Sequence, residues 1–560
     1  MTTADWAQEL RIDSSATAAR ITEARRQAGL SQWALASRLG IPLWKLDDVE
    51  RGESDGSPLL VEIAAATGRP QSWFAPAPMV EISHGATAPA ADASANLDLT
   101  ARPNRNFVFG GLALLVLIRF FTEGVHVVPR ALNFIDIPIF LAFVFAAVAQ
   151  PRRTRAGTMT FFALPAILFL LLCVVSVVLN PSRVEIGPVL VFLYGFLAPI
   201  GIYAAVYRLW PAGQALAVSK FLVAIGLVEL LVVFGFDLPR FLSTHNPDVV
   251  SGTFGTNAYQ LVFFLLVFTG LVAGIRTLER RRLAARFAPV IFVLVLATVF
   301  LAQYRALLLT TAVSILVIGL LLGPRGRGVV TGVIIVISFA ITLSYVATRF
   351  PVLNFSTTIA TLRNNPGFYA SARLHAAGNV LRLYEDKPLS IAVGTGPGTF
   401  SSRAWQTFAQ AGSKSQSNVQ GKYVLALTGG KIYHTDVSDK YVLTEQNGAV
   451  IQGSRQLSSP FATYFSLPAE VGLPGLILLF TLYARGAFRA GRMTVRSLKN
   501  ARLGDPLPPL LIACTTAFVV LLQMGLLSGN WFEVTRITFL TWALLAVTTR
   551  EYEARSEPAS

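Results

Sequence analysis

A series of long apolar segments fills most of the chain between residues 106 and 549. A bilayer core takes about 20 apolar residues per helix, and a helix satisfies its own backbone polar groups inside lipid. The chain is 53% hydrophobic and 14% charged, whereas a soluble domain carries about 25% charged residues. We therefore predict an all-α polytopic membrane protein with about twelve transmembrane helices. The predicted spans are residues 106–122, 135–150, 158–179, 186–206, 214–236, 256–275, 287–303, 305–322, 328–347, 463–484, 508–527 and 534–549.

Basic residues predict how these spans are oriented. Arginines and lysines gather in alternate connections, such as residues 152–155, 276–286 and 485–502, which is typical of loops that stay in the cytoplasm. Both termini are therefore expected in the cytoplasm, and the net charge of +16 reflects topology rather than nucleic-acid binding. The same alternation places residues 348–462 outside, as one large extracytoplasmic loop.

The remaining segments complete the predicted domain organisation. In chain order we expect a cytoplasmic helix-turn-helix domain at 1–75, a flexible linker rich in Ala, Pro and Ser at 76–105, spans one to nine at 106–347, the loop at 348–462, spans ten to twelve at 463–549 and a cytoplasmic tail at 550–560. Within the loop, residues 371–386 are expected to be helical. Alternation across 422–452, with Gly429-Gly430 and Asn447-Gly448, predicts β-hairpins. The loop is thus expected to be a small mixed α/β lid.

Cysteine usage argues against a disulfide framework or a thiolate metal site. The two cysteines, Cys173 and Cys514, lie in separate apolar segments far apart in the sequence. We expect neither a metal nor a cofactor.

The amino-terminal domain carries a recognisable order of short motifs. Gly29-Leu30-Ser31-Gln32, Leu39-Gly40-Ile41 and Val49-Glu50-Arg51-Gly52 follow one another. This order resembles the phage-repressor-like helix-turn-helix family, in which a recognition helix enters the major groove of DNA. The resemblance implies that the helix over about residues 43–48 is the recognition helix.

The composition of that helix disfavours DNA as the partner. It offers Leu43, Trp44, Lys45, Asp47 and Asp48. Residues 1–100 carry eight basic against thirteen acidic side chains, the opposite of what phosphate binding requires. We therefore expect this domain to bind a cytoplasmic protein through Leu43 and Trp44. DNA binding is the alternative, as is a structural role for Trp44 in the domain core.

Four local patterns lie near the predicted outer ends of spans or in the loop. They are Gly252-Thr253-Phe254-Gly255-Thr256-Asn257, Gln303-Tyr304-Arg305-Ala306, Gly394-Thr395-Gly396-Pro397-Gly398-Thr399-Phe400 and Glu470-Val471-Gly472-Leu473-Pro474-Gly475. Together with the twelve-span plan, they resemble the O-antigen ligase and O-antigen polymerase family. The resemblance implies transfer of a polyprenyl-diphosphate-linked glycan to an acceptor hydroxyl, without a metal, at the outer face of the bacterial cytoplasmic membrane. The partners implied are that glycan and membrane lipid.

A diphosphate site requires guanidinium groups. Arg305, at an outer membrane boundary, is the leading candidate, and Arg373 and Arg403 in the loop are the next. A snorkelling or solvated arginine is the alternative in each case. Further substrate contacts are expected from Asn257 and from the backbone of Gly394, Gly396 and Gly398, for which a tight turn is the alternative.

The base that activates the acceptor departs from the family pattern. The ligases place a His nine residues before the Glu-x-Gly motif, and here that residue is Phe461, which cannot accept a proton. His375, His434 and Glu470 are the substitutes that we consider. An ordinary surface histidine is the alternative for the first two.

Two other functions remain open at this point. Glu229 lies inside a predicted span, where an acid is costly and often functional, and no partner for it is evident from the sequence. The acid alone would suggest a transporter or flippase, but without a partner, and without an inverted repeat of interrupted helices, transport is the runner-up. A catalytically inert scaffold of the same architecture is the other, because the family's His is missing.

Overall fold

The computed structural model describes residues 18, 20–50, 59–70, 91–125, 127–129, 132, 134–150, 156–244, 249–255, 258–278, 283–302, 305–323, 367–409, 435–442, 445–446, 449–450, 463–501, 504–527, 529 and 531–556. Across these residues the chain is helical apart from connecting segments and one pair of two-residue strands. It forms two compact units, Met1–Ala93 and Ser94–Ser560.

The first unit is a small helical bundle. After a helical segment at residues 20–27, it contains α2 (Gln32–Arg38), α3 (Leu43–Glu50) and α4 (Leu60–Thr67). Ser31 caps α2, because its hydroxyl accepts a 3.1 Å hydrogen bond from the N–H of Ala34. An ion pair of 2.5 Å joins Arg25 to Glu50. The buried apolar side chains are Ile21, Ala24, Leu35, Ala36, Leu46, Val49, Ile63 and Ala64. The predicted helical bundle is thus confirmed.

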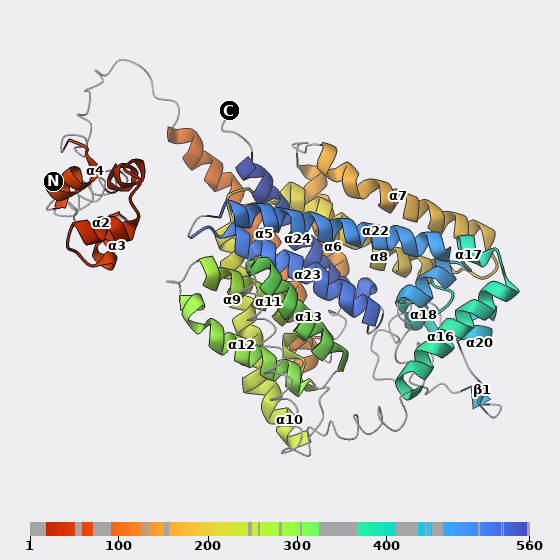
Figure 1. Ribbon diagram of the computed structural model, residues 1–560. Coiled ribbons are helices and arrows are strands. Elements are labelled where there is room, and N and C mark those ends of the chain that lie inside the picture. Colours follow the sequence, from red (N-terminus) through yellow and green to blue (C-terminus); the bar gives the residue numbers. More distant parts are fainter. Residues whose placement is uncertain are drawn as a thin grey trace. The chain divides into compact units, whose positions relative to one another are not determined.

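The second unit combines long apolar helices with a group of short elements (Figure 1). The helices up to residue 322 are α5 (Ala91–Arg119), the π-helical turn η3 (Phe120–Gly124), α6 (Asp136–Ala149), α7 (Ala156–Leu179), α8 (Ile186–Leu209), α9 (Ala215–Val232), the π-helical turn η5 (Val233–Asp237), α10 (Leu238–Thr244), the 3₁₀ turn η7 (Gly252–Phe254), α11 (Ala258–Leu278), α12 (Leu283–Leu301) and α13 (Arg305–Leu322). Between residues 367 and 450 lie α16 (Gly367–Asp386), α17 (Ser390–Val393), α18 (Arg403–Ala409), α20 (Asp436–Tyr441), β1 (Glu445–Gln446) and β2 (Ala449–Val450). The last helices are α22 (Thr463–Lys499), α23 (Leu507–Leu527), the 3₁₀ turn η10 (Trp531–Glu533) and α24 (Thr535–Ser556).

Seven of the described helices are long and apolar enough to cross a membrane. They are Asn104–Gly124, Phe161–Leu179, Ile186–Leu209, Ala215–Thr244, Ala258–Leu278, Thr463–Lys499 and Leu507–Gly525. Shorter apolar helices cover Asp136–Ala149, Phe287–Leu301 and Leu309–Leu322. The chain is therefore a multi-pass membrane protein. The predicted span 534–549 falls on α24, which is not among these seven helices or the three shorter ones. The predicted span 328–347 lies outside the described residues.

Burial separates the centre of the bundle from its periphery. The apolar windows of α11 and α23 are each 83% buried, whereas that of α7 is only 28% buried. Side chains such as Leu164, Leu171 and Val178 leave α7 with an exposed apolar face, as expected of a helix that contacts lipid. Inside the bundle, the ring of Trp542 lies 5.2 Å from that of Phe162 and 5.5 Å from that of Phe518.

Two predicted boundaries require correction. The helix α5 begins at Ala91, so residues 91–105, which we expected in the flexible linker, are helical; alternating alanines at 91, 93 and 95 favour a helix more than a tether. The helix α24 runs to Ser556, so most of the expected tail is helical as well. An ion pair of 2.8 Å between Arg489 of α22 and Glu553 of α24 joins the extended ends of these two helices.

The elements between residues 367 and 450 form a small folded group with its own core. Figure 1 shows α16, α17, α18 and α20 gathered near one end of α22. Their core contains Val380, Leu383, Phe400, Trp405, Phe408, Val437, Tyr441, Val442 and Ala469. The strands pair antiparallel, Glu445 opposite Val450 and Gln446 opposite Ala449, as the predicted hairpin requires; Asn447 and Gly448 themselves lie outside the described residues. The hairpin predicted at Gly429-Gly430 lies outside the described residues.

Candidate functional site

The helix α22 is interrupted close to its start, at the Glu-x-Gly-x-Pro sequence. Val471 (φ −130°) and Gly472 (φ +75°) leave the helical conformation. The physical cause is Pro474, which has no N–H to donate to the carbonyl of Glu470 four residues earlier. That carbonyl instead accepts hydrogen bonds from the N–H of Gly396 (2.9 Å) and the hydroxyl of Ser176 (3.1 Å).

The segment between α17 and α18, which we call the glycine-rich loop because it begins Gly394-Thr395-Gly396-Pro397-Gly398, wraps around the side chain of Glu470. Four backbone N–H groups donate to this buried carboxylate, those of Gly398 (2.6 Å), Phe400 (3.0 Å), Ser401 (3.1 Å) and Ser402 (3.0 Å). A Cβ at Gly394 would clash with the backbone of Glu470. Gly396, Gly398 and Glu470, which we expected to serve substrate binding and catalysis, therefore contact one another and hold the loop to the kink of α22. Their roles toward a substrate remain predictions.

Arg403 is the first residue of α18, directly after this loop. Its main-chain N–H donates a 2.7 Å hydrogen bond to Oε2 of Glu533. Its guanidinium carbon lies 5.8 Å from the centre of the Trp531 ring, within the range of a cation–π interaction. Burial lowers the pKa of Arg403; the charge of Glu533 opposes this effect and the charge of Arg119 adds to it. Arg119 and Arg403 are thus close enough to repel each other.

Two further arginines share this environment. Arg119 is the last residue of α5 and forms a 3.8 Å ion pair with Glu123 in the π-helical turn η3. Arg536, in the first turn of α24, is 3% exposed and interacts electrostatically with Arg119, Glu123 and Asp136. We call Arg119, Arg403 and Arg536 the arginine cluster. Three guanidinium groups in one buried region form a concentration of positive charge that carboxylates or a bound anion must balance.

Carboxyl groups hold the cluster in place. Oδ2 of Asp136, at the start of α6, accepts hydrogen bonds from the hydroxyls of Thr535 (2.8 Å) and Tyr194 (3.2 Å). Glu533 contributes the third carboxyl group, after Glu123 and Asp136. Burial raises the pKa of Glu533 to about 8. The charge of Glu470 also raises this pKa, and the charge of Arg403 lowers it. A neutral Glu533 leaves the cluster with one more positive than negative charge among these six side chains.

The Gly252–Gly255 turn supports Arg119 and Glu123. Oδ2 of Asp237 accepts the N–H groups of Ser251 (2.9 Å) and Gly252 (2.6 Å). Gly255 has a φ of +76°, and a Cβ there would clash with the carboxylate of Glu123. This part of the Gly-Thr-Phe-Gly-Thr-Asn pattern therefore requires glycine for two reasons, its backbone conformation and its close contact with the cluster.

Glu229 does have a partner. It accepts a 2.8 Å hydrogen bond from the N–H of Thr253 and a second, short one from the Thr253 hydroxyl. The expectation that this acid stands alone in its span is wrong, because the turn before α11 folds back onto it. Glu229 holds that turn, a structural role that its sequence context does not indicate.

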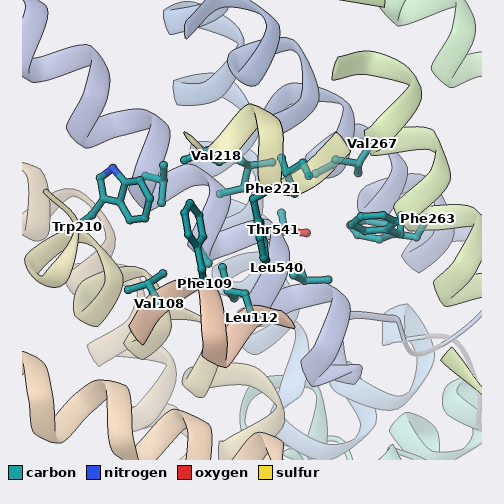
Figure 2. Close-up of a pocket in the computed structure, with 16 residues that line it drawn as sticks. Val108, Phe109, Leu112, Trp210, Val218, Phe221, Phe263, Val267, Leu540 and Thr541 are labelled. Atoms are coloured by element: carbon teal, nitrogen blue, oxygen red, sulfur yellow. The ribbon is translucent and has the colours of Figure 1, made fainter. Parts of the chain in front are cut away.

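An apolar pocket lies between α5, α9, α11, α23 and α24. Figure 2 shows the rings of Phe109 and Phe221 facing each other, stacked with 4.5 Å between centroids. The hydroxyl of Thr541 donates to the carbonyl of Ile537 (2.7 Å), and the indole nitrogen of Trp210 donates to Glu551 (2.9 Å). None of the described residues that line this pocket carries a charge. The pocket is therefore unsuited to an anion and separate from the arginine cluster.

The predicted site residues are thus only partly brought together. Arg403 belongs to the cluster, and Glu470, in α22, holds the neighbouring glycine-rich loop. Arg305 begins α13, and Arg373 and His375 lie within α16, but their side chains are outside the described part of the structure. Asn257, His434 and Phe461 lie outside the described residues. Among the described residues, no group of three or more His, Cys, Asp or Glu side chains has the arrangement of a metal site.

The sequence reasoning missed Arg119, Arg536 and Glu533. A signal was present, because each lies at or within four residues of an end of a predicted span. A charged residue at the end of a span can mark a functional site, and snorkelling to the interface is the alternative.

No known protein-family model matches this chain, and no curated protein matches its sequence.

The first unit presents a separate surface. Leu43, at the start of α3, is 45% exposed, and Trp33 of α2 is 70% exposed. The side chain of Trp44 is outside the described part of the chain. Exposed apolar side chains of this size on a small bundle are compatible with binding a protein partner.

Proposed function

We propose that the chain transfers or polymerises a polyprenyl-diphosphate-linked glycan onto an acceptor hydroxyl at the outer face of the bacterial cytoplasmic membrane. The observation that carries this proposal is the arginine cluster within a multi-pass membrane protein. Arg119, Arg403 and Arg536 come from three elements far apart in the sequence, and guanidinium groups are the side chains best suited to hold a diphosphate.

The predicted topology supports the same function. In the twelve-span plan with both termini in the cytoplasm, Arg119 and Asp136 fall at the outer ends of the first two spans. Arg403 falls in the outer loop, and Glu533 and Arg536 at the outer end of the last span. The orientation of the spans is predicted from the basic residues in the loops between them. The proximity of the three arginines comes from the packing of the helices. The packing brings these side chains together, and the predicted plan puts all of them at the outer ends of spans or in the outer loop, which supports a site for a lipid-linked glycan at the outer leaflet.

The chemistry requires stabilisation of the leaving group. As the bond between the sugar and the diphosphate breaks, negative charge develops on the departing phosphate oxygen. Fixed guanidinium groups in a buried site stabilise that charge more in the transition state than in the ground state. The carboxyl groups of Glu123 and Asp136 would keep the arginines oriented before the donor binds, and the loop at 348–462 would close over donor and acceptor.

The cytoplasmic unit would tether or regulate the enzyme. We propose that it binds a cytoplasmic protein through a surface that includes Leu43 and Trp44. Exposure of Leu43 and the excess of acidic residues in this region support that choice over DNA. A gel shift at low salt that shows tight, sequence-selective DNA binding would contradict it.

A reconstituted assay tests the transfer function. The purified full chain in phospholipid vesicles is supplied with carrier-linked glycan and acceptor lipids extracted from a strain that lacks the gene, and free polyprenyl diphosphate is measured by mass spectrometry. We expect release that depends on the protein and falls strongly for Arg403→Ala. Arg382→Ala, which removes an exposed arginine from α16, is the matched control. No release by the wild-type chain would contradict the proposal.

A further inference from the structure

Glu533 has an unusual environment for a carboxyl group. It is 7% exposed, and Oε2 accepts the N–H of Arg403. The N–H of Ala404 also acts on this carboxyl group, whereas Oε1 has no hydrogen-bond partner by distance and angle among the described residues. A buried carboxyl oxygen without a partner costs free energy. Natural structures keep few such atoms, and each requires an explanation.

The groups that face Glu533 come from several elements. Arg403 of α18 and Glu470 of α22 are the charges that act on it most strongly, and Arg536 follows three residues later in α24. On α8, Gly195 packs against it, since a Cβ there would lie 3.7 Å from the Cα and Cβ of Glu533. The packed helix α23 carries no charged residue. Glu533 is therefore a carboxyl group fixed on one oxygen beside the arginine cluster.

We propose that Glu533 is the base that takes the proton from the acceptor hydroxyl, in place of the histidine that this chain lacks at Phe461. This inference rests on the proposed glycan transfer. The acceptor oxygen forms a bond to the anomeric carbon, and the bond from that carbon to the diphosphate oxygen breaks. The electron pair leaves with the polyprenyl diphosphate, which the arginine cluster holds, and the hydroxyl proton moves to Oε1 of Glu533.

The ionisation of Glu533 suits this role. Its pKa of about 8 lies close to physiological pH, where a general base is most effective. Glu470 is less suited, because both of its carboxylate oxygens already accept backbone N–H groups.

The competing explanation is that Glu533 only fixes α18. The variant Glu533→Gln separates the two roles, since the amide oxygen can still accept the N–H of Arg403 but the side chain cannot take up a proton. Glu185→Gln is the matched control, because Glu185 is exposed next to α8 and its side chain makes no capping hydrogen bond.

The vesicle assay with extracted carrier-linked glycan tests the inference. We expect Glu533→Gln to lower kcat by about 100-fold or more, with KM for the donor within a few-fold of wild type and an unchanged Tm. The wild-type rate should rise with pH through an inflection near 8. Glu185→Gln should behave as wild type.

The outcomes distinguish the two proposals. A Glu533→Gln variant with the wild-type kcat overturns the inference and leaves glycan transfer intact. A wild-type chain that releases no polyprenyl diphosphate overturns both. If the Gln variant fails to fold, the wild-type pH profile decides: a flat rate between pH 6.5 and 9.5 contradicts a base with a pKa of about 8, whereas an inflection near 8 that Glu533→Asp displaces supports it.

Discussion

The main-chain N–H of Arg403 donates a 2.7 Å hydrogen bond to Oε2 of Glu533, 130 residues later in the chain. This contact joins α18, in the segment between the two groups of long helices, to the turn that precedes α24. It places a guanidinium group and a carboxyl group side by side in one buried region. Because the hydrogen bond comes from the backbone, the side chain of Arg403 can be changed without removing it.

Replacing Arg403 should therefore impair transfer more than folding. We expect Arg403→Ala to reduce the release of polyprenyl diphosphate by about 100-fold, the usual cost of losing one donor to a developing oxyanion. Arg403→Lys should recover only part of the rate, since an ammonium group cannot make the paired hydrogen bonds of a guanidinium. Rates are measured in vesicles, with Tm as the folding control. Equal rates for Ala and wild type would remove Arg403 from the site.

The coupling between Arg536 and Asp136 should be visible in stability. Arg536 is 3% exposed, and Asp136 is among the acids that interact with it. Arg536→Gln removes the attraction to Asp136 but also relieves the repulsion between Arg536 and Arg119, so we expect a loss below the roughly 3–5 kcal/mol of a broken buried ion pair. Adding Asp136→Asn should restore part of the loss. Thermal unfolding of the two single variants and the double variant in detergent measures the coupling; purely additive effects would show that the two groups do not interact.

Gly394 should tolerate no side chain. Its φ is +71°, and a Cβ would meet the backbone of Glu470 at the kink of α22. We expect Gly394→Ala to lower Tm sharply and to reduce the folded yield. Gly378→Ala is the control, because a Cβ there meets no atom within 4 Å and alanine favours a helix over glycine by about 1 kcal/mol. Similar Tm values for the two variants would contradict the packing described here.

Asp436 should make a small, pH-dependent contribution to the stability of the loop. It bonds Arg183 (2.9 Å) and Lys387 (2.8 Å). Burial alone would raise the pKa of Asp436, but these two partners hold it below its usual value. Because the pKa of Asp436 is lower in the folded than in the unfolded protein, its charge stabilises the fold at pH values above its unfolded pKa of about 3.9. This stabilisation is lost as the pH falls through the folded-state pKa.

The variant Asp436→Asn tests this sign. Because Asp436 is about half exposed, we expect the variant to lower the free energy of unfolding by at most about 1 kcal/mol at pH 7. The difference in Tm from wild type should shrink as the pH falls below 4. A difference that grows toward acid pH would contradict the assignment.

Local features of this fold could be predicted from the sequence. The apolar segment at 186–206 predicts α8, which spans Ile186–Leu209, and Ser31 marks the start of α2. Asn447-Gly448 predicts the hairpin of β1 and β2. These predictions succeed because periodicity, capping and turn chemistry act over a few residues.

The candidate site could not be predicted in the same way. Pro474 shows that the carbonyl of Glu470 loses its helical partner, but nothing local indicates that Gly396 replaces it. Arg119 and Arg536 are separated by more than 400 residues, and their proximity follows from which helices pack together. Apolar periodicity identifies membrane helices without specifying their neighbours.

Deleting the gene is the most direct test of the central claim. Surface polysaccharide is compared by gel and lipid-linked intermediates by mass spectrometry, in the deletion strain and in the same strain complemented with the wild-type chain. We predict accumulated carrier-linked glycan with shortened or absent surface polymer on deletion, both reversed by complementation. An unchanged glycan profile in both measurements would contradict glycan transfer as the function of this protein.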